Sequence, residues 1–380
     1  MRKIVIAPDS FKESLSAREV AASIARGLAS QLPHTELLQL PVADGGEGTL
    51  DALLDATAGQ RIRQRVTGPQ NTPLFAHWGL LGDGHGAVIE MASASGLEHV
   101  PRQQRNPLAS TSYGTGELIR SALDHGARHI ILALGGSATN DGGAGMLAAL
   151  GVRWLDAGGQ PLPPGGAALA QLARIDSSAL DPRLAECRFD IACDVDNPLC
   201  GPHGASAVFG PQKGADAAMV AQLEQALAHY GAMLEQHCGK AVEEQPGAGA
   251  AGGMGAAALA FLPCRLRRGI DIVLDSVGLD AALEGADLVI TGEGRLDGQT
   301  VFGKTPIGVA RRAKQHGLPV IAIGGSLGDG VEAVHQHGID AVFACVDRIT
   351  TLEQALDDAA ANLERCARNI GALLALGSKS

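Results

Sequence analysis

Short apolar runs alternate with amphipathic segments at both ends of the chain. Residues 3–7 have the pattern of a buried strand, and the segment from Ser16 to Glu19 matches a capping box at the start of a helix. The same order returns near the C-terminus, where we expect strands at 287–291, 320–323 and 341–344 and helices at 305–316 and from about Leu352 onward. This alternation predicts an α/β domain with a parallel sheet.

The middle of the chain has a different pattern. Residues 66–91 contain short alternating stretches broken by Gly and Pro, which predict an antiparallel meander. Strands are expected at 130–134 and 189–193, a long helix at 216–237, and a flexible segment at 247–255. We therefore predict one domain built from both termini (1–70 and 281–380) and an inserted mixed α/β domain (71–280). Two consecutive domains are the alternative.

Charge and composition exclude several classes of protein. The 30 Lys and Arg residues are outnumbered by 41 Asp and Glu, which gives a net charge of −11 and argues against nucleic-acid binding. The seven cysteines form no Cys-x-x-Cys pair, so neither a disulfide framework nor a zinc site is indicated. No apolar run is long enough for a membrane span, and the run before Pro8 is too short for a signal peptide. We expect a cytoplasmic protein that does not bind membranes; its oligomeric state is not predicted.

Five polar, glycine-rich segments each follow an expected strand. They are residues 7–12, 43–49, 135–143, 193–198 and 291–297. Ligands of open α/β sheets bind beyond the carboxyl ends of the strands. One such segment is more often an ordinary turn, but five together predict a polar site that accepts an anion.

The segment from Gly298 to Thr305 matches the phosphate-loop pattern G-x-x-x-x-G-K-T. That motif requires its first glycine to follow a strand directly. The expected strand ends near Thr291, and residues 292–297 intervene. We therefore expect no true phosphate loop here, and favour a phosphate bound by Gly303, Lys304 and the N-terminus of the following helix.

Six segments in order along the chain resemble the bacterial glycerate kinase family (class I). They read IAPDSFKESLSA, PVADGGEGT, GGSATNDGGAG, CDVDNPLCG, FGPQKGA and TGEGRLDGQT with GKTP, and they extend from residue 4 to about residue 326. The resemblance implies ATP-dependent phosphorylation of D-glycerate, with the 2-hydroxyl as acceptor in the most similar members. It also implies a flavodoxin-like domain with an inserted second domain.

Phosphoryl transfer requires a base for the acceptor hydroxyl and cations for the phosphates. We assign Asp194 as the base, with Asp44 and Asp297 as the next candidates, and Lys12 and Lys213 as the neutralising cations. Asp194 and Asp196 suit Mg²⁺; alternatively, they form an Asx-turn before a proline. Either lysine could instead be a solvated surface residue.

The remaining candidates divide between the substrate and the nucleotide. Those expected to bind glycerate are Asp9, Ser10, Asp44, Glu47, Arg295 and Asp297. Those expected to bind ATP or its phosphates are Gly135, Gly136, Ser137, Thr139, Asn140, Asp141, Gly292, Glu293 and Lys304. An arginine is the natural partner of a substrate carboxylate, although Arg295 could equally pair with Asp297 at the surface.

Two other functions compete with a kinase. One is a non-catalytic α/β protein that binds a small organic anion, although such proteins usually carry an export signal. The other is a nicotinamide-dependent oxidoreductase, which is disfavoured because the first strand leads into Pro8 rather than into G-x-G-x-x-G.

Overall fold

The computed structural model describes residues 1–46 and 48–377. The chain forms two compact units, one from Met1–Thr57 and the segment beginning at Ile270, the other from Ala58–Gly269. Glu47, a predicted substrate ligand, lies outside the described residues. Both boundaries between the units lie earlier in the sequence than predicted, after Thr57 and Gly269 rather than after residues 70 and 280. The first boundary is earlier because β3 (Gln60–Thr67) pairs with β4 (Pro73–Leu80) and so belongs to the sheet of the second unit.

The first unit contains a parallel sheet in the described part of the chain. Its strands lie in the order β13-β12-β11-β1-β2, with bounds β1 Lys3–Ile6, β2 Glu36–Gln39, β11 Leu288–Leu296, β12 Val320–Leu327 and β13 Ala341–Ala344. This is the flavodoxin-like order, in which the chain reverses direction across the sheet between its first and third strands. Here that switch point lies between β1 and β11, and the predicted fold class is confirmed.

The helices of the first unit surround this sheet. They are α1 (Ala17–Ala29), α2 (Thr49–Thr57), α9 (Gly269–Ser276), α10 (Leu279–Leu283), α11 (Thr305–Gln315), α12 (Leu352–Asp357) and α13 (Ala359–Gly377). The predicted capping box is present at α1, where the Ser16 hydroxyl accepts from the Glu19 N–H and the Glu19 carboxylate accepts from the Ser16 N–H. The single C-terminal helix expected from Leu352 is instead two helices that meet at Asp358.

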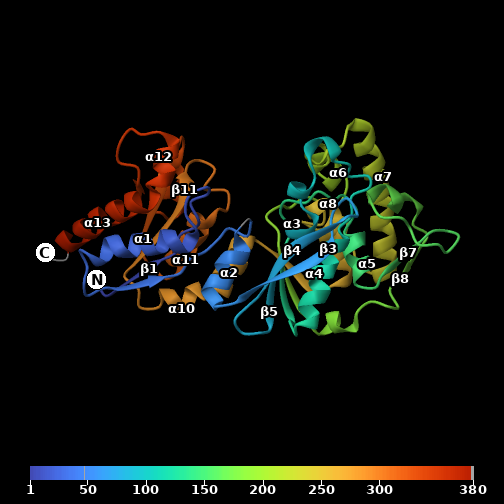
Figure 1. Cartoon of the computed structure of the whole chain (residues 1–380), viewed down its shortest axis with the longest axis horizontal. Coiled ribbons are helices and arrows are strands. Elements are labelled where there is room, and N and C mark those ends of the chain that lie inside the picture. Colours follow the sequence, from blue (N-terminus) through green and yellow to red (C-terminus); the bar gives the residue numbers. More distant parts are fainter. Residues whose placement is uncertain (47, 378–380) are drawn as a thin grey trace. The chain divides into compact units, whose positions relative to one another are not determined.

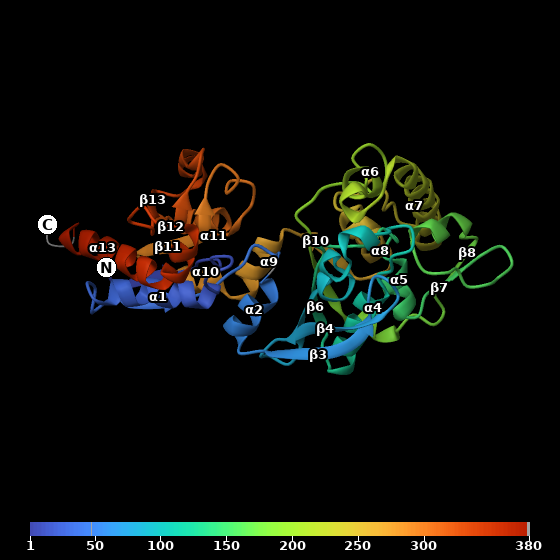
Figure 2. The same ribbon diagram turned by 45° about the horizontal axis from the view of Figure 1, so that its top comes forward.

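Helices α1 and α13 lie side by side, although they come from opposite ends of the chain (Figures 1 and 2). Gly27 makes the close approach possible, because a Cβ atom at this position would lie 2.3 Å from the Glu364 carbonyl oxygen. Apolar side chains from β1, α1 and α13, among them Ile6, Ile24 and Leu363, form a common core. This packing holds the two ends of the chain in one unit.

The second unit contains a mixed sheet, again within the described residues. Its order is β10-β9-β6-β5-β4-β3, with further bounds β5 Gly86–Glu90, β6 His129–Ala133, β9 Arg188–Ala192 and β10 Cys264–Arg267; β7 (Arg153–Leu155) and β8 (Arg174–Asp176) form a separate pair. The antiparallel pairs β3–β4 and β4–β5 confirm the predicted meander. The α-helices are α3 (Ala92–Ser95), α4 (Tyr113–Asp124), α5 (Ala144–Ala149), α6 (Ala205–Phe209), α7 (Ala217–Cys238) and α8 (Ala250–Phe261).

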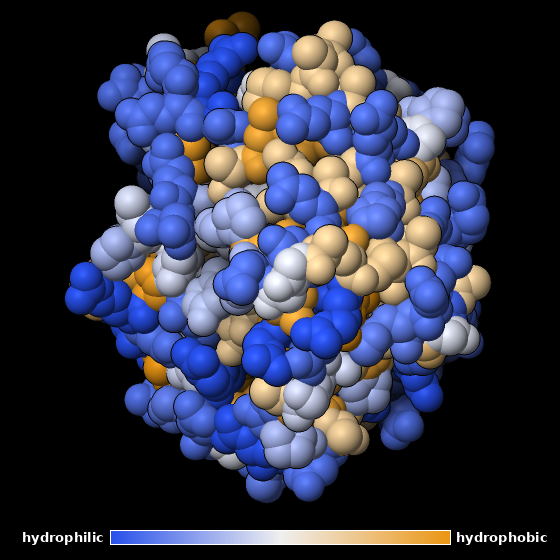
Figure 3. All heavy atoms as spheres, turned by 90° about the vertical axis from the view of Figure 1, so that its right-hand side faces the viewer, coloured by the Kyte–Doolittle hydropathy of each residue, from blue (hydrophilic) through white to orange (hydrophobic). Residues whose placement is uncertain are grey.

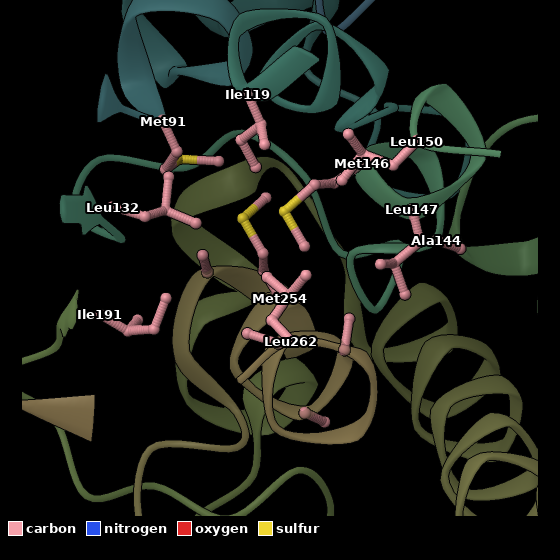
Figure 4. Close-up of a cluster of buried hydrophobic side chains, with 14 of the residues drawn as sticks. Met91, Ile119, Leu132, Ala144, Met146, Leu147, Leu150, Ile191, Met254 and Leu262 are labelled. Carbon is pink, nitrogen blue, oxygen red and sulfur yellow. The ribbon is translucent and has the colours of Figure 1, made fainter. Parts of the chain in front are cut away.

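The core of the second unit lies between one face of the sheet and its helices. Figure 4 shows Met91, Met146 and Met254 facing one another among leucine and isoleucine side chains from strands and helices. Hydrophilic and apolar residues are mixed on the face seen in Figure 3, which views the molecule from the right-hand side of Figure 1. No helix in the described part of the chain is both long and apolar enough to cross a bilayer.

The segment 247–255, expected to be flexible, is a buried turn at the start of α8. Ala251, Gly252 and Gly253 have positive φ values inside this element. Gly252 lies against the segment after β6, where a Cβ atom would meet the Thr139 carbonyl oxygen at 2.1 Å. The glycines therefore serve close backbone packing rather than mobility.

Candidate active site

A cavity of about 650 Å³ opens in the first unit at the carboxyl ends of its strands. It lies at the switch point between β1 and β11, where open α/β sheets bind their ligands. Its polar lining consists of residues from the strand ends and the segments that follow them: Asp9, Ser10, Lys12, Glu13, Ser14, Asp44, Glu293, Arg295, Lys304 and Ser326. The structure thus brings together seven of the predicted site residues.

Strand β11 is longer than the sequence indicates. It continues past Thr291 to Leu296 and pairs with β12 as far as Leu327, so most of the expected loop 291–297 is strand. Gly292 permits this pairing, because a Cβ atom there would lie 2.2 Å from the Ile323 carbonyl oxygen. Within the strand, Glu293 is buried and Arg295 is exposed.

Asp9 is the most perturbed carboxylate of this cavity. Its Oδ2 accepts a hydrogen bond from the Thr305 hydroxyl at 2.5 Å, and its Oδ1 accepts from the Ser10 N–H at 2.6 Å. Burial raises the pKa of Asp9 to about 6; the nearby Asp44 raises it further, whereas the Thr305 and Ser10 hydrogen bonds oppose the shift. The Asp9 side chain can therefore exchange a proton near neutral pH.

Glu293 is held in place by two partners on the segment between β11 and α11. The Thr300 hydroxyl donates to its Oε1 at 2.6 Å, and the Lys304 Nζ lies 3.4 Å from its Oε2. Burial raises the pKa of Glu293, and these two contacts oppose the shift. Lys304 is therefore both a cation at the cavity and the partner of a buried acid.

The phosphate-loop match occurs in a more favourable context than expected. Because β11 ends at Leu296, Gly298 follows a strand closely, and Thr305 is the first residue of α11. The prediction that residues 292–297 separate strand from motif is wrong. In this structure, however, the two side chains that would bind the phosphate group have other partners. The Thr305 hydroxyl donates a hydrogen bond to Asp9, and the Lys304 ammonium pairs with Glu293.

Two further cations line the cavity. Lys12 is exposed in the segment after β1. The Arg295 Nε lies 3.1 Å from Asp297 Oδ2, which is the surface pairing named above as the alternative, but the Arg295 side chain is 65% exposed and also lines the cavity. Both cations are accessible to an anionic ligand.

A second group of predicted residues comes together inside the second unit. Thr139, Asn140, Asp141 and Lys213 are all buried, with the Lys213 Nζ donating to the Thr139 carbonyl oxygen at 2.6 Å. Burial lowers the pKa of Lys213 to about 7, and the negative charge of Asp141 opposes this shift. In this structure the Lys213 ammonium is directed to the backbone of its own unit.

Asp141 organises the surrounding backbone. Its Oδ2 accepts from the Ser112 N–H and hydroxyl, both at 2.8 Å, and from the Gly145 N–H at 3.2 Å, while its Oδ1 accepts from the Gly143 N–H at 3.1 Å. Burial raises the pKa of Asp141, and these hydrogen bonds oppose the rise. Nearby, Gly135 and Gly136 are exposed and Ser137 is buried.

Asp194 and Asp196 are exposed in the segment after β9. The Asp194 Oδ1 accepts a hydrogen bond from the N–H of Gly269, the first residue of α9, at 3.0 Å. Over residues 1–46 and 48–377, no group of three or more His, Cys, Asp or Glu side chains is arranged to hold a metal. Mg²⁺ at phosphoryl-transfer sites needs only one or two carboxylates along with phosphate oxygens and water.

Sequence reasoning missed one side of the cavity. Val346, Leu352, Ala355, Leu356 and Ala359 form an apolar wall after β13 and along α12 and the start of α13. Their spacing predicts only an ordinary amphipathic helix, so the pattern gives no sign of a ligand. The sequence could have indicated Thr305 as a site residue, because Thr305 is the last position of the phosphate-loop pattern.

Comparisons with known proteins agree with this architecture. The glycerate kinase family matches residues 4–375. A glycerate kinase of Bacillus subtilis is 56% identical over 98% of both chains, and a glycerate 2-kinase of Escherichia coli is 53% identical over 100% of this chain and 99% of its own. A crystal structure from Salmonella typhimurium LT2, provisionally assigned as glycerate kinase 2, superposes with a TM-score of 0.93 at 54% identity and covers all of both chains. The chain belongs to the glycerate kinase family.

Proposed function

We propose that this protein transfers the γ-phosphoryl group of ATP to D-glycerate, on the 2-hydroxyl, and releases 2-phosphoglycerate and ADP. The observation that carries the proposal is the 53% identity, over nearly the whole of both chains, to a protein named glycerate 2-kinase. The cavity at the switch point of the first unit supports it, because its cations and carboxylates suit phosphoryl transfer.

The chemistry needs a base that accepts the proton of the glycerate hydroxyl as the oxygen attacks phosphorus. Asp9 suits this role, because a general base is most effective when its pKa lies near the working pH and that of Asp9 is about 6. Asp194, the base expected from the sequence, is the competing candidate. We place Asp9 first because it shares a cavity with Lys12 and Arg295.

The charge on the phosphates must be neutralised during transfer. Lys12, Arg295 and Lys304 can supply positive charge in the first unit. When bound, Mg²⁺ would withdraw charge from the phosphate oxygens. Asp194 and Asp196 remain the proposed ligands, since two exposed carboxylates in one loop meet its modest requirement. A cytoplasmic location also remains a prediction.

The test is ADP formation from ATP and Mg²⁺ with and without D-glycerate, using L-glycerate as the control. We expect ADP release that depends on D-glycerate, with ³¹P and ¹H NMR identifying 2-phosphoglycerate as the product. Release of 3-phosphoglycerate would overturn the choice of hydroxyl. If no ADP forms in response to glycerate, the kinase assignment is wrong. The alternative function, non-catalytic binding of a small organic anion, would then be favoured.

A further inference from the structure

The cavity of the first unit has two chemically different sides. Its polar side is formed by the strand ends, with Lys12 and Arg295 accessible from solvent. Its apolar side includes Val346, Leu352 and Leu356. Leu352 is 73% exposed, so it contributes little to the core and presents its side chain to the cavity.

The two substrates of the proposed reaction fit this cavity very differently. D-glycerate is a three-carbon acid whose carbons all carry oxygen, so it has no group to place against an apolar wall. An adenine nucleotide has a flat base at one end and phosphates at the other. The volume of about 650 Å³ falls within the range of sites for ligands of nucleotide size.

The charges at the polar side are compatible with phosphate. Four carboxylates line the cavity. Glu293 is paired with Lys304, Asp9 accepts from Thr305 and Asp44 accepts from the Gly46 N–H, whereas Glu13 is exposed to solvent. The accessible cations are then Lys12 and Arg295, and a phosphate can compete with Asp297 for the Arg295 guanidinium because the pair lies at the surface.

We infer that this cavity is the nucleotide site. The adenine ring lies against Leu352, Leu356 and Val346, and the phosphates lie toward Lys12, Arg295 and Lys304. The inference rests on the proposed kinase activity for its choice between ligands. It also assigns a function to the apolar wall formed by the segment after β13 and by α12, which is recognition of the adenine ring. It also leaves the end of the cavity near Asp9 as the place where the terminal phosphate meets glycerate.

The test replaces Leu352 with glutamine, which keeps the size of the side chain and adds no charge. The matched control is Leu373→Gln, because Leu373 is also an exposed leucine on a C-terminal helix, at 60%, and lies outside the cavity lining. Binding of MgATP is measured by calorimetry without glycerate, and melting temperatures check that both variants are folded. We expect ATP to bind about tenfold more weakly to Leu352→Gln and with wild-type affinity to Leu373→Gln.

Steady-state kinetics give the second readout. Leu352→Gln should raise KM for ATP by a similar factor and leave KM for D-glycerate unchanged. Unchanged ATP affinity, or a raised KM for glycerate alone, would overturn the nucleotide assignment. Failure of the proposed function would look different, since the wild type would then release no glycerate-dependent ADP whatever its affinity for ATP.

Discussion

The segments after β1 and after β6 carry similar residues but have different environments. Both follow a buried strand and combine hydroxyl, carboxylate and small side chains. After β1, Asp9 and Ser10 line a cavity with Lys12. After β6, Thr139 and Asp141 are buried, and their hydrogen bonds connect parts of the same unit. Similar motifs can thus build a ligand site or an internal polar network.

Backbone packing accounts for the difference. Gly252 contacts the segment after β6 directly, and its carbonyl oxygen accepts from the Gly142 N–H at 2.9 Å. Lys213 closes the network with an ammonium group directed inward. In the first unit, the side chains that follow β1 and β11 at the switch point line an open cavity instead.

The largest effect is expected from removing the hub of the buried network. Asp141→Ala would leave four donors on Ser112, Gly143 and Gly145 without their acceptor, three of them buried and the Gly145 N–H partly buried. We expect the free energy of unfolding to fall by about 3–5 kcal/mol, measured by urea denaturation. The control is Asp196→Ala at an exposed position, expected to change stability by less than about 0.5 kcal/mol. Equal stabilities of the two variants would contradict the structural role of Asp141.

A large catalytic effect is expected at Asp9. Asp9→Asn keeps an oxygen that can accept from Thr305 but loses the proton-accepting carboxylate, so kcat should fall at least ~100-fold. Asp194→Asn is the matched comparison. If that variant loses more activity than Asp9→Asn, and a higher Mg²⁺ concentration does not restore it, the base is Asp194, as first expected from the sequence.

The same Asp9 variant should gain stability. The pKa of Asp9 is about 6 in the folded protein and near 3.8 when unfolded, so its contribution to stability is complete below pH 3.8 and is lost as the pH rises through 6. At pH 7.5, Asp9→Asn should therefore unfold with a free energy about 1–3 kcal/mol higher than wild type. A less stable, inactive variant would show that Asp9 serves the fold.

Lys213 should impose a pH dependence on stability. Its pKa is about 7 when folded and near 10.5 when unfolded, so the unfolded chain binds more protons between these values and stability rises with pH. Relative to Lys213→Met, the wild type should gain up to about 1.4 kcal/mol per pH unit between pH 7 and 9. Lys240→Met, at an exposed position, should keep the wild-type slope. Equal slopes for wild type and Lys213→Met would show that Lys213 is not buried as a neutral amine.

The sequence predicts the fold better than it predicts the site. Alternating strands and helices indicate the parallel sheet, and the capping box at Ser16 fixes the start of α1. The extension of β11 to Leu296 could not be predicted, because glycine and charged residues are typical of loops and only pairing with β12 makes them a strand. The inward direction of Lys213 depends on tertiary packing, which no local pattern encodes.

The most direct test of the contrast between the two regions is the ATP-induced shift in melting temperature. A ligand that binds only the folded state at about 100 times its Kd stabilises it by about 2.7 kcal/mol. Lys12→Met, at the cavity, should melt like wild type without ATP and lose most of the shift at a MgATP concentration of about 100 times the wild-type Kd. Lys213→Met should change the melting temperature without ATP and keep the shift. A full shift in Lys12→Met together with a lost shift in Lys213→Met would contradict the account, because the nucleotide would then depend on the buried network around Lys213.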